Sequence, residues 1–138
     1  MTAAEIAAVA LGCAATATDL RRRTIPNWLT AAGAAAGVIC GGAAGWRDAA
    51  AAVAGMAAGF LIFLVFHWLG GLAGGDVKLM AAFGALLGTR DVLAAAALAA
   101  IAGGVLACVA LLRRPCAVSI PYAPAITAGA WLVLWARR

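Results

Sequence analysis

The stretch LGGLAGGDVKLMAAFGALLG, residues 69–88, decides the fold of this chain. It consists of glycine and apolar residues, interrupted by one aspartate and one lysine, Asp76 and Lys78. Residues 77–88 would rise only about 18 Å as a helix, which is too short to cross a bilayer alone. Because a charge inside or beside a membrane segment is costly, Asp76 is a candidate functional residue.

The rest of the chain is equally apolar. Of its 138 residues, 67% are hydrophobic and 11% are charged, whereas a soluble domain is about half apolar and about a quarter charged. This composition excludes an ordinary soluble domain and predicts an integral membrane protein. No long polar stretch interrupts the chain, so we expect residues 1–138 to form a single membrane-embedded domain without a separate soluble domain.

The apolar residues fall into separate runs. These runs cover about residues 3–18, 26–45, 49–69, 77–88, 91–112 and 119–136. A spanning helix needs about 20 residues, so the second, third and fifth runs qualify easily and the first and last are marginal. We predict an all-α membrane protein, a compact bundle of about six transmembrane helices with short loops and a short fourth helix. Four or five spans are the alternatives.

Basic residues gather in alternate connections between these runs. The first, third and fifth connections hold Arg21, Arg22, Arg23, Lys78, Arg113 and Arg114. By the positive-inside rule these connections face the cytoplasm, which predicts a multi-pass protein of the inner (cytoplasmic) membrane. Basic flanks also bind anionic headgroups of the lipid bilayer. The net charge of +5 therefore does not indicate a nucleic-acid partner.

Small residues recur at a helical spacing. Gly33, Gly37, Gly41 and Gly45 repeat every four residues, and this spacing lets membrane helices approach closely. We expect packing within one chain, with a homodimer through the glycine stripes as the alternative. The cysteines are widely spaced and include no C-x-x-C pair, and His67 is the single histidine. A metal site is therefore not expected. The cysteines are Cys13, Cys40, Cys108 and Cys116.

Two aspartates, Asp19 and Asp76, fall on the predicted cytoplasmic side. If the bundle brings them together, two close carboxylates share one proton. One can then take a proton from water while the other polarises a carbonyl and protonates the leaving amine, as in aspartic proteases. This chemistry needs no metal or other cofactor. The structural alternatives are a helix N-cap for Asp76 and an interface charge paired with the neighbouring arginines for Asp19.

Three stretches together resemble a known family. They are TDLRRRTIPNWLT (residues 18–30), GGDVKLMAAFGALLG (74–88) and SIPYAPAITAGA (119–130), and they are similar to type IV prepilin peptidases of the GxGD group of membrane aspartyl proteases. The small size resembles the Tad/CpaA-like branch. The resemblance implies that Asp19 and Asp76 are catalytic. It also implies that five residues bind substrate or shape the site: Gly74, Gly75, Lys78, Pro26 and Asn27.

The same resemblance implies a substrate and a place of action. The substrate would be a prepilin or pseudopilin whose basic leader is removed at the cytoplasmic face of the membrane. The cysteine-rich methyltransferase region of larger relatives is not expected here. One position departs from the family pattern, because Ala73 stands where G-x-G-D has its first glycine. If that position requires a left-handed backbone, alanine would weaken the site.

Two other classes of function stay open. The first is a non-catalytic membrane subunit of a pilus or secretion assembly machine, in which the two aspartates serve only as a cap and an interface charge. The second is a small proton-coupled carrier, because paired membrane carboxylates also relay protons. The position of the aspartates at the ends of runs, and the lack of a visible inverted repeat, disfavour the carrier.

Overall fold

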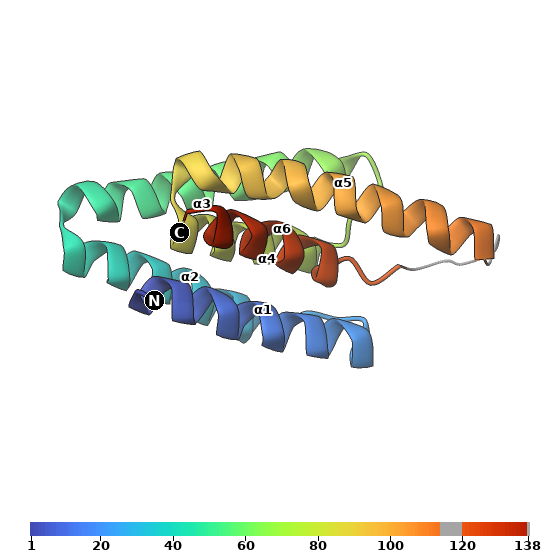
Figure 1. Cartoon of the computed structure of the whole chain (residues 1–138), viewed down its shortest axis with the longest axis horizontal. Helices are drawn as coiled ribbons and strands as arrows, with labels where there is room; N and C mark the ends of the chain where they lie inside the picture. The colour runs from blue at the N-terminus through green and yellow to red at the C-terminus, as the bar shows by residue number, and fades with distance from the viewer. Residues whose placement is uncertain (114–119, 138) are drawn as a thin grey trace.

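The computed structural model describes residues 1–113 and 120–137 as a bundle of six α-helices. Helices adjacent in sequence run antiparallel (Figure 1). These described residues include no β-strand, so the predicted all-α bundle is confirmed. Cys116, Arg114 and Ser119 lie outside the described residues. The helices are α1 (Ala3–Arg22), α2 (Asn27–Ala44), α3 (Trp46–Trp68), α4 (Gly74–Leu87), α5 (Thr89–Arg113) and α6 (Ala123–Ala136).

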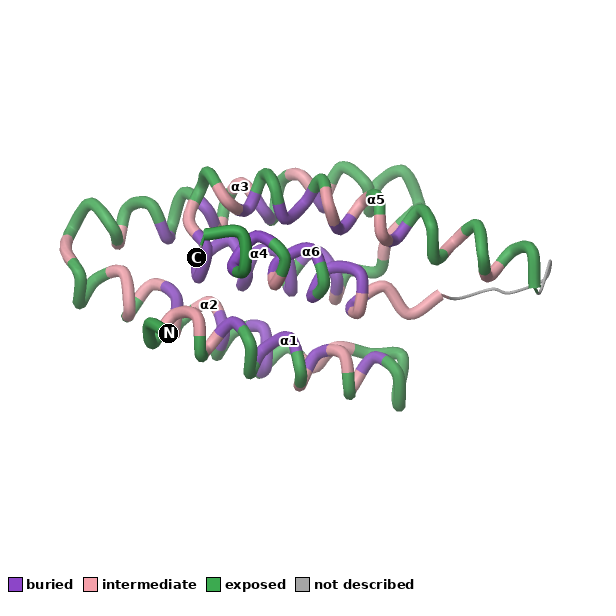
Figure 2. Tube along the Cα trace, viewed as in Figure 1, coloured by how far each residue is buried: buried purple, intermediate pink, exposed green. Residues whose placement is uncertain are grey.

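The helix α4 forms the centre of the bundle. It packs against each of the other five helices, and every residue from 76 to 87 except Lys78 is buried (Figure 2). Its 14 residues rise about 21 Å, as expected for the short fourth helix. A helix that is apolar on all sides is typically buried, and here the other five helices surround it.

The surrounding helices face outward with large apolar side chains. Within the described residues, α1, α3 and α5 are long and apolar enough to cross a membrane. The second run, which the sequence predicted to span easily, forms the 18-residue α2, and this helix is not one of the three. Exposed apolar side chains cover the outer surface, as lipid contact requires. Examples are Ile39, Leu61, Val65, Ile101, Val105 and Leu112.

Glycines occupy the places where α4 crosses its neighbours. A Cβ atom at Gly37 would lie 2.5 Å from the Ala85 backbone, and one at Gly55 would lie 2.3 Å from the Gly84 carbonyl oxygen. Gly33 faces Leu11 and Ala82 in the same way. The glycine spacing therefore serves packing within one chain, as expected. A homodimer through these stripes stays a prediction.

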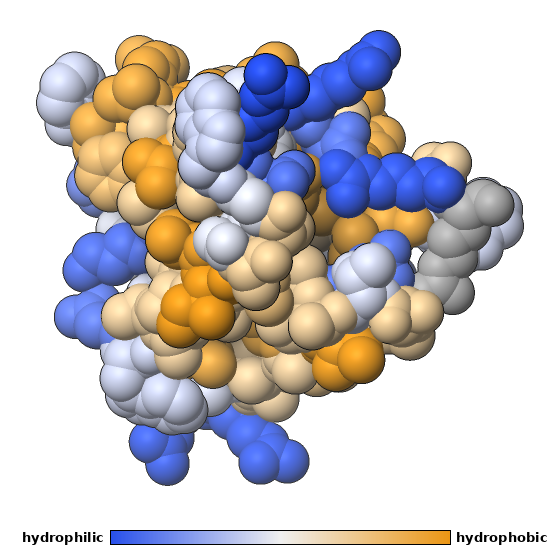
Figure 3. Space-filling view, turned by 90° about the vertical axis from the view of Figure 1, so that its left-hand side faces the viewer, coloured by the Kyte–Doolittle hydropathy of each residue, from blue (hydrophilic) through white to orange (hydrophobic). Residues whose placement is uncertain are grey.

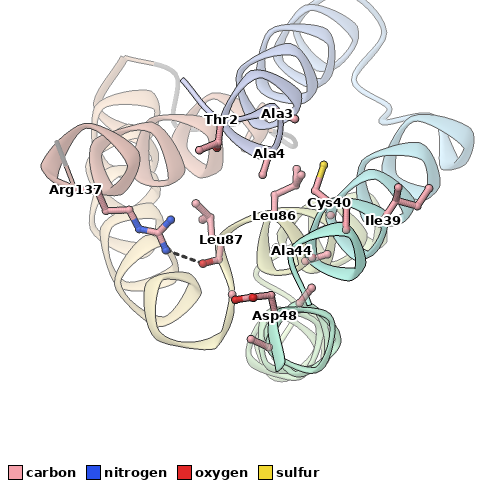
Figure 4. Close-up of a pocket in the computed structure, with 17 residues that line it drawn as sticks. Thr2, Ala3, Ala4, Ile39, Cys40, Ala44, Asp48, Leu86, Leu87 and Arg137 are labelled. Atoms are coloured by element: carbon pink, nitrogen blue, oxygen red, sulfur yellow. Dashed lines mark hydrogen bonds between the residues drawn. The ribbon is translucent and has the colours of Figure 1, made fainter. Parts of the chain in front are cut away.

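The end of the bundle that carries both chain termini is closed by Arg137. Its Nη2 donates to the Leu87 carbonyl at 2.7 Å (Figure 4). The same nitrogen also pairs with the Asp91 carboxylate. A cavity of about 510 Å³ opens beside Leu87 and is lined by Thr2, Asp48 and mostly apolar residues. Figure 3 looks at this end and shows charged side chains around apolar ones. Neither Asp19 nor Asp76 lies here.

Candidate active site

The C-terminal end of α1 and the N-terminal end of α4 lie toward the other end of the bundle, away from the chain termini (Figure 1). Asp19 and Asp76, on these two helix ends, line one cavity. The cavity has a volume of about 210 Å³. Asp19 is 7% exposed and Asp76 is 5% exposed, so both are buried although they carry carboxyl groups. The two aspartates are 57 positions apart in sequence. They come together because the C-terminal end of α1 and the N-terminal end of α4 meet at this end of the bundle.

The last turn of α1 positions Asp19. The sequence predicted that the first apolar run ends at residue 18, but α1 continues through Arg22 and ends at Arg23, which has a left-handed backbone with φ 52°. Asp19 Oδ2 accepts a hydrogen bond of 3.0 Å from the backbone N–H of Ala123, the first residue of α6. The first N–H groups of a helix have no hydrogen-bond acceptor within that helix. Asp19 supplies an acceptor for one of these groups of α6 and thereby links α6 to α1.

The first turn of α4 positions Asp76. The N-cap of α4 is Ala73, and Asp76 is the third residue of the helix, so the alternative that Asp76 is the N-cap was wrong. Asp76 Oδ2 instead reaches back and accepts the Ala73 N–H at 3.2 Å. Ala73 has φ −77° and ψ 154°, an extended backbone that any residue adopts. The departure from glycine at this position therefore creates no backbone strain.

The cavity raises the proton affinity of Asp76. This residue lies at the end of α4, outside the three helices that are long enough to cross a membrane. Burial raises the pKa of its carboxyl from an ordinary 3.8 to about 6, the Ala73 N–H lowers it, and the nearby charge of Asp19 raises it.

Tyr122 is a wall of this cavity that sequence reasoning did not assign to the site. It precedes α6 directly, and its hydroxyl donates to the Ala99 carbonyl at 3.1 Å. Burial raises the pKa of the Tyr122 phenol, and the charge of Asp76 raises it further. The available signal was its place in SIPYAPAITAGA, between Pro121 and Pro124 in a stretch that resembles the family's final segment.

The five predicted site-shaping residues take different places. Gly75 and Asn27 line the aspartate cavity, and Lys78 Nζ donates to Asn27 Oδ1 at 2.9 Å, so Lys78 acts on the cavity wall through Asn27. Pro26 is the N-cap of α2, and neither it nor Gly74 is among the described residues that line this cavity. No group of three or more His, Cys, Asp or Glu side chains comes together in the described ranges.

Comparison with known proteins identifies the family. The sequence profile of the type IV leader peptidase family matches residues 6–108, a range that contains both aspartates. The chain belongs to the type IV leader peptidase family. This membership confirms the resemblance seen in the sequence motifs.

A curated relative of the family is the prepilin leader peptidase/N-methyltransferase of Bacillus subtilis (strain 168). It is 38% identical over 90 residues, which cover 59% of this chain and 35% of the relative. The chain therefore spans about a third of the length of that relative. No solved structure matches the chain.

Proposed function

We propose that this leader peptidase removes the leader peptide of prepilin or pseudopilin subunits by aspartic endopeptidase chemistry at the cytoplasmic face of the inner membrane. The observation that carries the proposal is the presence of Asp19 and Asp76, both buried, in one cavity. The name of the Bacillus subtilis relative, a prepilin leader peptidase/N-methyltransferase, supports the choice of substrate.

The raised pKa of Asp76 supports a division of roles between the two carboxyl groups. Asp76, with its raised pKa, is the member that keeps the proton and donates it to the substrate carbonyl oxygen. Asp19 is the base that takes a proton from water while the water oxygen adds to the carbonyl carbon. When the C–N bond breaks, the leaving amine takes the proton that Asp19 received from water, and a hydroxyl group of the intermediate returns a proton to Asp76. The products are a carboxylic acid and a new amino terminus.

The distribution of charge supports the cytoplasmic face. Arg21, Arg22 and Arg23 end α1 beside the aspartate cavity, and Lys78 and Arg113 belong to the same end of the bundle. By the positive-inside rule, this end lies in the cytoplasm. A leader that stays in the cytoplasm is then within reach of the site.

The test is co-expression with a prepilin and measurement of leader removal on a gel. We expect Asp19→Asn and Asp76→Asn each to lower the rate of processing by about 10²–10⁴-fold, the usual contribution of a general acid or base. Asp48→Asn is the matched control, because Asp48 is exposed at the other end of the bundle, and it should process normally.

The same experiment decides between this function and a non-catalytic subunit of an assembly machine. Full processing by either aspartate variant would remove the two-aspartate mechanism. A lack of processing by the wild-type protein with its prepilin would favour the non-catalytic subunit.

A further inference from the structure

The single histidine of the chain lies beside the loop that leads into the candidate active site. His67 is the second-last residue of α3, and residues 69–73 connect α3 to α4. Its ring nitrogen Nδ1 lies 2.7 Å from the carbonyl oxygen of Leu72. A carbonyl oxygen only accepts hydrogen bonds, so Nδ1 carries the hydrogen and donates it. The neutral ring with its hydrogen on Nδ1 and the protonated ring can both make this bond.

The carbonyl of Leu72 and the N–H of Ala73 belong to the same peptide group. The Ala73 N–H donates to Asp76 Oδ2 at 3.2 Å. A trans peptide group is planar, so its C=O and its N–H point in opposite directions within one plane. This one peptide group therefore connects the ring of His67 on one side to the buried carboxyl group of Asp76 on the other.

The other hydrogen bonds of the loop do not fix this peptide group. Gly70 and Gly71 donate their N–H groups to carbonyls in the last turn of α3, which holds the first half of the loop against that helix. Within the described residues, no hydrogen bond to the Leu72 carbonyl is found besides the one from His67. The direction of the peptide group that follows Leu72 therefore depends on His67.

We infer that His67 is a positioning residue, which directs the Ala73 N–H at the Asp76 carboxyl group through the peptide group between Leu72 and Ala73. Its part in catalysis rests on the proposed function. A fixed peptide group holds the carboxyl group in the geometry that proton transfer requires. A carbonyl that accepts a hydrogen bond also polarises its own peptide group, which makes the N–H a better donor.

The proton affinity of Asp76 reports on this connection. Burial raises the pKa of Asp76 to about 6, and the Ala73 N–H opposes that rise. Loss of the bond from His67 should weaken the Ala73 N–H as a donor and so raise the pKa further, by up to about one pH unit. Other titratable or charged groups line the same cavity or belong to the same helix, and they stay unchanged in the comparison of His67 variants: Asp19, Arg23, Tyr122 and Lys78.

Two substitutions separate the hydrogen bond of His67 from its bulk. His67→Asn keeps a donor, because the amide nitrogen of asparagine can take the place of Nδ1. His67→Leu removes the donor and keeps a side chain of moderate size. Because His67 is exposed, both variants should fold. Trp68→Leu is the matched control for the loss of an exposed ring at the end of α3.

The first measurement is the pH dependence of kcat and KM for a prepilin, with the purified protein in detergent. We expect His67→Leu to lower kcat by about 10–10²-fold and to leave KM unchanged, because His67 acts on a catalytic group and not on the substrate. The alkaline limb of its kcat profile, where Asp76 loses its proton, should move up by as much as about one pH unit. His67→Asn and Trp68→Leu should keep the wild-type kcat and profile.

The second measurement needs no cleavage. The ¹³C signal of the Asp76 carboxyl group is followed against pH by NMR, in an Asp19→Asn background that removes the coupled titration. The signal is assigned by its loss in Asp76→Asn. His67→Leu should raise the pKa of Asp76 in this background, and His67→Asn should not.

Three results would overturn the inference. They are an unchanged kcat and titration in His67→Leu, equal losses in His67→Leu and His67→Asn, and a fall in kcat without a change in the Asp76 titration. The last result would show a structural role for the ring alone. Absence of cleavage by the wild type would overturn the proposed function, and the NMR titration would still decide whether His67 acts on Asp76.

Discussion

Replacing Gly84 with alanine should weaken both the fold and the activity. A Cβ at Gly84 would lie 2.1 Å from the carbonyl oxygen of Gly55, where α4 crosses α3. A carbon and a carbonyl oxygen normally approach no closer than about 3.3 Å, so the two helices must separate by about 1 Å. Because the obstacle is backbone, no side-chain rotation can relieve it.

The expected magnitudes follow from this displacement. Overpacking of a tightly packed site costs about 1–3 kcal/mol in the free energy of unfolding. The shift also reaches the site, because Gly84 and Asp76 belong to the same helix and lie about 12 Å apart along it. A displacement of about 1 Å at reacting groups can lower the rate about 10²-fold. We therefore expect a loss of activity in a variant that touches no residue of the aspartate cavity.

Two measurements check this prediction, unfolding by SDS in mixed micelles and the rate of precursor cleavage. Gly42→Ala is the control, because a Cβ there meets no atom within 4 Å, and alanine is favoured over glycine in a helix by about 1 kcal/mol. It should be as stable as the wild type or more stable. If Gly84→Ala matches Gly42→Ala in both assays, the close contact between α3 and α4 does not position the site.

Two further predictions concern charged residues of the site. Because burial holds the Asp76 pKa near 6, above its ordinary 3.8, the folded protein binds this proton more tightly than the unfolded chain, and its stability falls as pH rises from about 4 to 7. The variant Asp76→Asn lacks the titrating carboxyl and therefore this pH dependence. Between about pH 4 and 7 the free energy of unfolding of the wild type should fall relative to that of the variant by up to about 3 kcal/mol. If the unfolding free energies of the two proteins follow parallel pH profiles, the Asp76 carboxyl is not buried. The variant Lys78→Met loses the hydrogen bond to Asn27. Because Lys78 is exposed, the free energy of unfolding should change by less than about 1 kcal/mol. The rate of precursor cleavage should fall several-fold. Arg22→Met, at an exposed residue of the same end, is the control, and equal cleavage rates in the two variants would show that Lys78 has no part in shaping the cavity.

The helices were predictable from the sequence because hydrophobic runs and their polar connections report directly on membrane segments. Their ends were less predictable. Residues 19–22 are charged or exposed for the most part and so fell outside the first apolar run, yet they continue α1 because the helix bonds extend to the left-handed Arg23. The hydrophobicity of the residues alone therefore does not predict at which residue a helix ends.

The central position of α4 was not predictable from its composition. Its sequence VKLMAAFGALL is no more apolar than the runs of α3 or α5, and only the packing shows that α4 is enclosed while those helices face outward. The bond from Ala123 to Asp19 was hidden for a related reason, since it joins residues 104 positions apart. A single sequence gives no signal that such a pair is in contact, although both residues lie in stretches that resemble the family.

The short length of α4 sets how far Asp76 stands from the end of the bundle that carries the chain termini. The hydrocarbon layer is about 30 Å thick, and from Leu87 at the closed end of the bundle to Asp76 the helix rises only about 16 Å. Asp19 stands about 24 Å along α1 from its first residue, which belongs to the same closed end. Both carboxyl groups therefore lie within one hydrocarbon thickness of the end of the bundle that carries the chain termini, and in the proposed reaction the peptide bond has to enter the cavity of about 210 Å³ to reach them.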